Sequence, residues 1–301
     1  MKFGVREICD VVFKAKAKTT IGSTTFEQGQ PVLYIDSAKT STIEGAATTV
    51  YAQGGKGNAR LIAWEGEKTL TFTVEDALLS PIGFSVLSGA GLFKGLESEE
   101  VHVHTTANAV VSADNKISLT DVLATGEEID TTAPVFVMLM EDGSITEVVK
   151  ATSVDAAEIT VADAAGKTVF VDFYVTKKGN TVSELQIDAE NFAGSYYVEA
   201  STLFRRESDG KDMPAEITLP NVKIQSNFTF SMASTGDPST FTFTMDAFPG
   251  YTMFDKSKKV LCVIQIVDET AAEKAKGKSV MLHADTEIID EEKVDSDDLS
   301  I

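Results

Sequence analysis

Polar and apolar residues alternate strictly at positions 69–74, which read Thr69-Leu70-Thr71-Phe72-Thr73-Val74. Residues 225–232 and 240–245 repeat this pattern. Because successive side chains of a strand point to opposite faces, the alternation predicts antiparallel strands with one buried and one exposed face. Threonine suits the exposed positions, since its branched Cβ fits a pleated surface. The chain is therefore expected to be mainly β.

The last two alternating stretches are joined by Ala233-Ser234-Thr235-Gly236-Asp237-Pro238-Ser239, which is rich in turn-forming residues. This arrangement predicts a β-hairpin of residues 225–232 and 240–245. Further strands are predicted at 3–13, 32–36, 48–53, 60–64, 135–140, 145–150, 158–162, 167–175 and 260–267.

Ser80-Pro81 predicts the start of a helix, because serine is a favoured N-cap and proline suits the first helical position. Gly89 and Gly91 are expected to end it. A second, short helix is predicted at 269–276. The expected fold is an antiparallel β-sandwich or barrel with one or two flanking helices and an inserted small β-sandwich.

Changes in composition predict the domain boundaries. Residues 1–106 and 179–284 form one β-domain, residues 107–178 are inserted as a small β-sandwich, and residues 285–301 are an acidic tail, rich in Asp and Glu. The alternative is one continuous sheet system along the whole chain.

The overall charge argues against binding of nucleic acid. The 301 residues carry a formal net charge of −20, which repels a phosphate backbone. Cys9 and Cys262 are expected to be buried free thiols. We expect no secretory signal, and no stretch approaches the roughly 20 apolar residues of a membrane-spanning helix.

No catalytic pattern is present, so we expect no enzyme, no cofactor and no metal. His102 and His104 alternate on one strand face, but a metal site would need a third ligand that the sequence does not identify. Residues 54–58 contain three glycines and a lysine without the spacing of a phosphate-binding loop. Glu75 and Asp76 are neighbours on a strand and would point to opposite faces. Arg205 and Arg206, flanked by Glu207 and Asp209, predict local ion pairs.

Two stretches carry a resemblance to a known family. Residues 60–83, a strand followed by the predicted helix, and residues 219–248, the predicted hairpin ending in Asp246-Ala247-Phe248, resemble tail tube proteins of long-tailed bacteriophages. The resemblance covers roughly residues 1–100 and 185–268. Residues 107–178 lie outside it and could decorate the tube or contact a sheath.

The resemblance implies a structural role in a virion tail that is assembled in the host cytoplasm. Such subunits form hexameric rings, which stack into a tube, and their strands join into one barrel around a channel. The expected partners are further copies of the chain, the tape measure protein and DNA in the lumen without specific binding, and a contractile sheath if the tail has one, with no membrane. An acidic, Thr-rich channel would let DNA slide during ejection.

The resemblance also implies which residues matter. Candidates for the inter-subunit barrel strands are Leu70, Phe72, Val74, Phe228, Phe230, Met232, Phe241, Phe243 and Met245. Residues 37–59 are expected to be a long loop that stacks on the next ring, with candidates Thr42, Gly45, Gly54, Gly55 and Gly57. The alternative for this segment is a flexible surface hairpin.

Two other functions stay open at this point. One is a different virion or surface protein, such as a capsid decoration protein or a fibre module. The other is a carbohydrate-binding module or β-sandwich enzyme, which would expose aromatic residues. Trp64, the single tryptophan, lies within a predicted strand, where packing in the core is expected.

Overall fold

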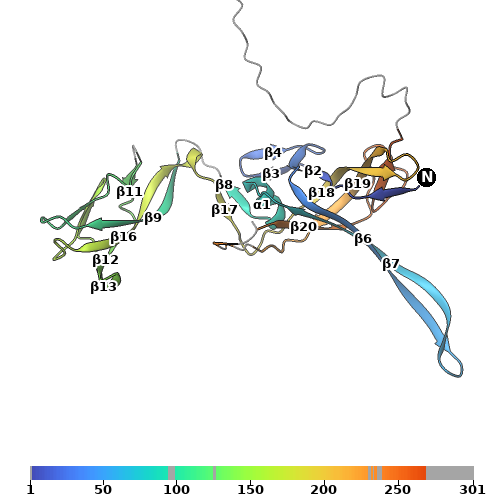
Figure 1. Ribbon diagram of the computed structural model, residues 1–301, viewed down its shortest axis with the longest axis horizontal. Helices are drawn as coiled ribbons and strands as arrows, with labels where there is room; N and C mark the ends of the chain where they lie inside the picture. Colours follow the sequence, from blue (N-terminus) through green and yellow to red (C-terminus); the bar gives the residue numbers. More distant parts are fainter. Residues whose placement is uncertain are drawn as a thin grey trace, which may run out of the picture.

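The computed structural model describes residues 2–93, 99–124, 127–229, 232, 234–235 and 239–268. Figure 1 shows a larger β-body that carries β2, β18, β19 and β20, a smaller unit that carries β9, β12 and β16, and a hairpin of β6 and β7 that runs out from the larger body. Within the described residues the fold is mainly antiparallel β with one α-helix.

The elements in chain order are β1 (Phe3–Val5), β2 (Asp10–Ala15), β3 (Thr19–Ile21), β4 (Thr24–Phe26), β5 (Pro31–Ile35), β6 (Ala38–Gly54), β7 (Ala59–Asp76), α1 (Pro81–Ser88), β8 (Gly91–Phe93), β9 (Glu100–Val110), β10 (Lys116–Ser118), β11 (Glu128–Ile129), β12 (Phe136–Glu141), β13 (Ser144–Lys150), β14 (Ser153–Asp155), β15 (Glu158–Thr160), β16 (Thr168–Lys178), a 3₁₀ turn (Gly179–Thr181), β17 (Glu184–Gln186), β18 (Ser195–Arg206), β19 (Asp212–Ile224), β20 (Phe241–Ala247) and β21 (Val263–Ile266).

The main sheet has nine strands in the order β5-β2-β18-β19-β20-β7-β6, with β1 paired to β18 and β21 paired to β19. The sheet curls, because Phe13 of β2 and Phe243 of β20 meet with ring centroids 5.9 Å apart although β18 and β19 lie between their strands. Both rings are fully buried in one core with Phe72, Val74 and Met245.

Helix α1 covers part of this core with Val86 and Leu87. Its start is as predicted, since the Ser80 hydroxyl accepts a hydrogen bond from the backbone N–H of Gly83 at 2.9 Å and Pro81 is the first helical residue. The helix ends at Gly89, whose φ is +77°. A Cβ at this position would lie 2.3 Å from the carbonyl carbon of Phe192, so only glycine fits.

The predicted hairpin of residues 225–232 and 240–245 is wrong in its first strand. Strand β19 takes that place, because Val222–Ile224 pair with Met245–Ala247. The Gln225 N–H still donates to the Thr244 carbonyl of β20 at 2.8 Å, and residues 226–229 then leave the sheet. Phe228 packs edge-on against Phe84 of α1 at 4.9 Å between ring centroids. Met232 is exposed, and Phe230 lies outside the described residues. The alternation here therefore reflects packing on the helix.

The expected long loop at residues 37–59 is also wrong, because most of it is strand β6. The strands predicted at 48–53 and 60–64 are confirmed, and the alternative of a surface hairpin describes the segment better. Strand β6 pairs with β7 from Ala38↔Asp76 to Gly54↔Ala59. Only the tip at residues 55–58 is a turn, in which Gly55 and Gly57 have φ of +78° and +87°. Small residues such as Gly45, Ala46 and Ala47 concealed the strand pattern, since they give no polar and apolar alternation.

The smaller unit contains a five-stranded sheet in the order β11-β16-β12-β13, with β9 also paired to β16, and a three-stranded sheet β10-β15-β14. The strands predicted from the sequence within residues 135–175 are confirmed. It has its own core, which includes Phe173, Val171, Ile117 and Leu119. The pairing of β9 with β16 starts at Glu100, ahead of the boundary expected at 107.

In the smaller unit, two histidines on the exposed face of β9 each pair with an aspartate of another segment. His102 Nδ1 lies 2.6 Å from Asp130 Oδ2, and His104 Nε2 lies 2.6 Å from Asp172 Oδ1. Asp130 is buried and also accepts hydrogen bonds from the hydroxyl and the backbone N–H of Thr132 at 2.6 and 2.8 Å. These donors, led by Thr132 and followed by His102, lower the pKa of the Asp130 carboxyl.

Both cysteines are free, Cys9 buried and Cys262 partly buried. The predicted helix at 269–276 and the predicted tail at 285–301 lie outside the described residues. Within the described part of the chain, no helix is long and apolar enough to cross a membrane.

We predict that Phe243→Ala lowers the free energy of unfolding by about 3–5 kcal/mol, because it opens a cavity where the curled sheet packs on itself. Urea denaturation followed by circular dichroism measures this loss. Phe254→Ala is the matched control, since that ring is 96% exposed and its removal should change stability by less than about 0.5 kcal/mol. Equal losses in the two variants would contradict the placement of Phe243 in the core.

We predict that Asp130→Ala lowers the free energy of unfolding at pH 7 by about 1–3 kcal/mol, since Thr132 and His102 lose their acceptor. A carboxyl whose pKa is lowered by folding stabilises the fold above its unfolded pKa of about 3.9, and this contribution disappears as the pH falls through the folded pKa. The difference from the unmodified protein should therefore shrink below about pH 4.

Denaturation of both proteins at pH 7, 5 and 3 tests the Asp130 prediction, with Asp121→Ala at an exposed position as control. A loss that stays the same at pH 3 would show that the ionised carboxylate is not its source.

Candidate assembly surfaces

The outer face of strands β6, β7 and β20 carries polar side chains in three rows across the sheet. The register places Thr40, Glu75 and Thr242 side by side, then Thr42, Thr73 and Thr244, then Glu44, Thr71 and Asp246. We call these nine residues the polar sheet face. All are exposed or partly exposed, and they include three carboxylates and no basic residue. These three strands thus concentrate hydroxyls and negative charge on one surface, and the exposed Lys223 of β19, which pairs with Asp246, continues the third row.

Hydrogen bonds order this face. Glu75 accepts from the hydroxyls of Thr240 at 2.5 Å and Thr40 at 3.2 Å, and these donors lower the pKa of the Glu75 carboxyl. Asp246 accepts from Gln225 Nε2 at 3.0 Å. These hydrogen bonds favour the ionised form of Glu75 and fix its side chain along the surface.

The apolar residues predicted for the barrel strands lie on the opposite face. Phe72, Val74, Phe243 and Met245 are buried in the core, and Leu70, Phe228 and Phe241 pack against it. Strands β7 and β20 therefore present their polar side chains, and not these apolar ones, on the surface of the chain. Strand β6, which pairs only with β7 among the described strands, is one edge of the main sheet.

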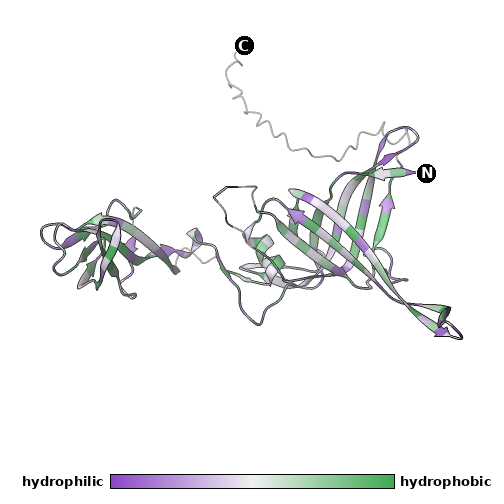
Figure 2. Cartoon of the chain, turned by 60° about the horizontal axis from the view of Figure 1, so that its bottom comes forward, coloured by the Kyte–Doolittle hydropathy of each residue, from purple (hydrophilic) through white to green (hydrophobic). Residues whose placement is uncertain are grey.

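Beyond the body, the β6–β7 hairpin continues as residues 46–66, which we call the arm (Figure 1). Val50 and Trp64 are paired, and Ile62 lies on the same face; they are 62%, 53% and 55% exposed. On the arm, Arg60 lies over the ring of Tyr51 at 4.2 Å. Figure 2 shows hydrophobic and hydrophilic residues mixed along this hairpin. Exposed apolar side chains on an isolated hairpin are typical of an interaction surface.

The residues predicted for the stacking loop are distributed along this hairpin. Thr42 belongs to the polar sheet face, Gly45 lies just before the arm, and Gly54, Gly55 and Gly57 are at the arm's tip. The expectation that Trp64 packs in the core is wrong, because its part of β7 has left the body. The alternating pattern predicted the strand but could not show where the body ends.

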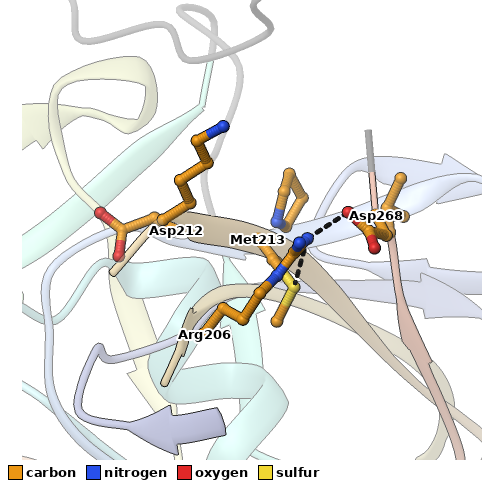
Figure 3. Close-up of a pocket in the computed structure, with 7 residues that line it drawn as sticks. Arg206, Asp212, Met213 and Asp268 are labelled. Atoms are coloured by element: carbon orange, nitrogen blue, oxygen red, sulfur yellow. Dashed lines mark hydrogen bonds and ion pairs between the residues drawn. The ribbon is translucent and has the colours of Figure 1, made fainter. Parts of the chain in front are cut away.

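A small cavity of about 20 Å³ lies beside Arg206, close to the last described residue (Figure 3). Arg206 Nη2 donates to the carboxylate of Asp268 and contacts Met213 Sδ at 3.5 Å. Arg205 makes a two-pronged contact with Asp212 at 2.7 and 2.8 Å. The predicted local ion pairing is confirmed for Asp209, which lies 3.7 Å from Arg206 Nε. The cluster fixes the end of β21 to β18 and β19.

The described residues contain no group of three or more His, Cys, Asp or Glu side chains placed to hold a metal ion. Asp76 is buried and accepts hydrogen bonds from the Ser37 hydroxyl and the Leu78 backbone N–H, while its neighbour Glu75 lies on the polar sheet face. The carboxylates of Glu75 and Asp76 thus lie on opposite faces of β7, and each accepts hydrogen bonds from neighbouring residues of the chain.

The comparisons with known proteins agree with an assembly role. The model of the YomU/Tube protein family matches residues 20–260, which include most of the main sheet, the arm and the smaller unit. A search of curated proteins finds no match. Because the family match spans well over half of the sequence, the chain belongs to the YomU/Tube protein family and is a structural component of a bacteriophage tail tube.

Proposed function

We propose that this chain is the repeating subunit of the tube, that six copies form a ring, and that stacked rings enclose a channel for DNA. The observation that carries this proposal is the polar sheet face with its three ordered rows. Its nine residues present hydroxyls and carboxylates to a sugar-phosphate backbone, and the base nearest in register is Lys223 at the end of one row. DNA and the tape measure protein could occupy such a channel in turn without adhering to it.

Ring closure uses the edges of the main sheet in this proposal. Strand β6 leaves one row of backbone N–H and C=O groups without a partner strand in the described chain. Such an edge pairs readily with another chain, and identical subunits related by rotation can satisfy all edges at once. The strands β6, β7 and β20 of each copy would then line one continuous barrel.

In this proposal the arm makes the contact between stacked rings. Its apolar side chains gain nothing in an isolated subunit, and its length carries them away from the body. The smaller unit of residues 100–178 lies at one end of the main body, and the arm runs out at the opposite end (Figure 1). We place it outside the tube, where it could meet a sheath or the surroundings.

The purified chain should polymerise into hollow filaments of uniform diameter, which negative-stain electron microscopy detects. Only compact monomers over a range of salt and protein concentrations would contradict the proposed tube subunit.

The channel assignment predicts the effect of charge on DNA retention. Thr42→Lys, Thr73→Lys and Thr244→Lys together place one lysine row on the polar sheet face, and tubes formed with short duplex DNA should retain it in a salt-dependent way. Co-sedimentation measures the retained DNA. The control carries Ser144→Lys, Ser153→Lys and Thr168→Lys at exposed positions of the smaller unit. Equal retention by both tubes would refute the placement of this face in the channel.

A further inference from the structure

Residues 248–262 form a cover segment over the outer face of β18 and β19. The segment follows β20 and ends at β21. It is held by the Phe248 N–H, which donates to the Asn221 carbonyl at 2.7 Å, and by a reciprocal backbone pair between Gly250 and Val260 at 3.0 and 2.8 Å. The Met253 N–H also lies 3.4 Å from the Tyr197 hydroxyl. These bonds give the segment a fixed shape.

Beneath the cover segment lies a cavity of about 510 Å³, which is far larger than the one beside Arg206. Its charged lining consists of Glu199, Glu216 and Asp255 with the single base Lys258. Burial and the nearby Glu199 raise the pKa of the Glu216 carboxyl. Glu199 is itself paired with Lys14, so Glu216 and Asp255 are the carboxylates of the lining that a basic group from outside the cavity could face.

The rim of the cavity is aromatic and apolar. Phe254, which lines the cavity, is 96% exposed, and Tyr251 and Met253 of the same segment are also exposed. An ordered segment that presents such side chains to solvent is typical of an interface. The cavity thus combines apolar contact area with negative charge.

The arm has the complementary chemistry. The arm carries two basic residues, Lys56 and Arg60, close to its tip and one acidic residue, Glu65, at its base, in a protein whose net charge is −20. They lie among the exposed apolar residues Val50, Ile62 and Trp64. The arm points away from its own body in Figure 1, so its basic tip is presented to other molecules.

We propose that the cavity beneath the cover segment receives the arm of a second copy of this chain. Apolar residues of the arm lie against Phe254 and its neighbours, and Lys56 and Arg60 face Glu216 and Asp255. This inference rests on the proposed function, because that function assigns the contact between subunits to the arm and the inference adds the site that receives the arm. It accounts for the exposed apolar residues of the arm and for those of the cover segment.

Charge reversal tests the pairing. Lys56→Glu with Arg60→Glu on the arm, or Glu216→Lys with Asp255→Lys in the cavity, should each reduce the fraction of sedimenting assemblies at least tenfold. A chain that carries all four substitutions should recover assembly, because both partners are reversed. The control is Lys150→Glu with Lys167→Glu, exposed in the smaller unit, and should assemble normally. Full assembly by either reversed pair would overturn the proposal.

A second measurement remains decisive if a reversed chain folds poorly. The photoreactive amino acid p-benzoylphenylalanine replaces Leu61 of the arm, which is 65% exposed, in otherwise unmodified chains. Assemblies are made from a mixture of ¹⁴N- and ¹⁵N-labelled protein, irradiated and digested for mass spectrometry. The proposal requires cross-linked peptides of mixed isotope composition that include residues 248–265. Cross-links confined to other regions, or to the same chain, would overturn it.

The two proposals can fail separately. Hollow filaments with cross-links elsewhere would leave the tube and refute the cavity as the receiving site. Cross-links to the cover segment in an assembly without a channel would support the receiving site and refute the tube.

Discussion

The packing of one sheet against itself is the constraint on which the rest of this structure depends. Phe13 and Phe243 meet across the core although two strands separate them in the sheet. Their contact closes the apolar faces of β2, β18, β19, β20 and β7 around one interior. Every alternate residue of these strands must then face outward, and that outward set includes the rows of threonine and carboxylate. The assembly surfaces are thus a direct consequence of how the core closes.

The sequence predicted the elements whose signals are local. Strands β7 and β20 follow from strict alternation, and α1 follows from Ser80-Pro81 at its start and Gly89 at its end. Residues 226–229 have the same alternation but lie outside the sheet, because β19 occupies the place beside β20 and Phe228 packs on the helix. Competition between two segments for one partner strand is a property of the whole fold, and periodicity alone cannot predict its outcome.

The candidate surfaces were predictable to different degrees. The polar face of β7 and β20 could be read from every second residue, but its three rows depend on a register that no motif specifies. Strands were predicted at 48–53 and 60–64 within the arm, but residues 37–59 as a whole were expected to be a loop because glycine and alanine hide part of the pattern. Trp64 was expected in the core because a sequence does not show where a hairpin leaves its body. The cavity joins residues 197–218 to residues 252–265 and has no signal within either segment.

The isolated arm has a thermodynamic consequence for the free subunit. Its two strands bury little apolar surface, so water hydrates Val50, Leu61, Ile62 and Trp64 until another molecule covers them. Removing this surface from water lowers the heat capacity, and near room temperature its driving force is mainly entropic. Subunit association through the arm therefore becomes more favourable on warming from the cold, and chilled subunits are the ones that stay apart.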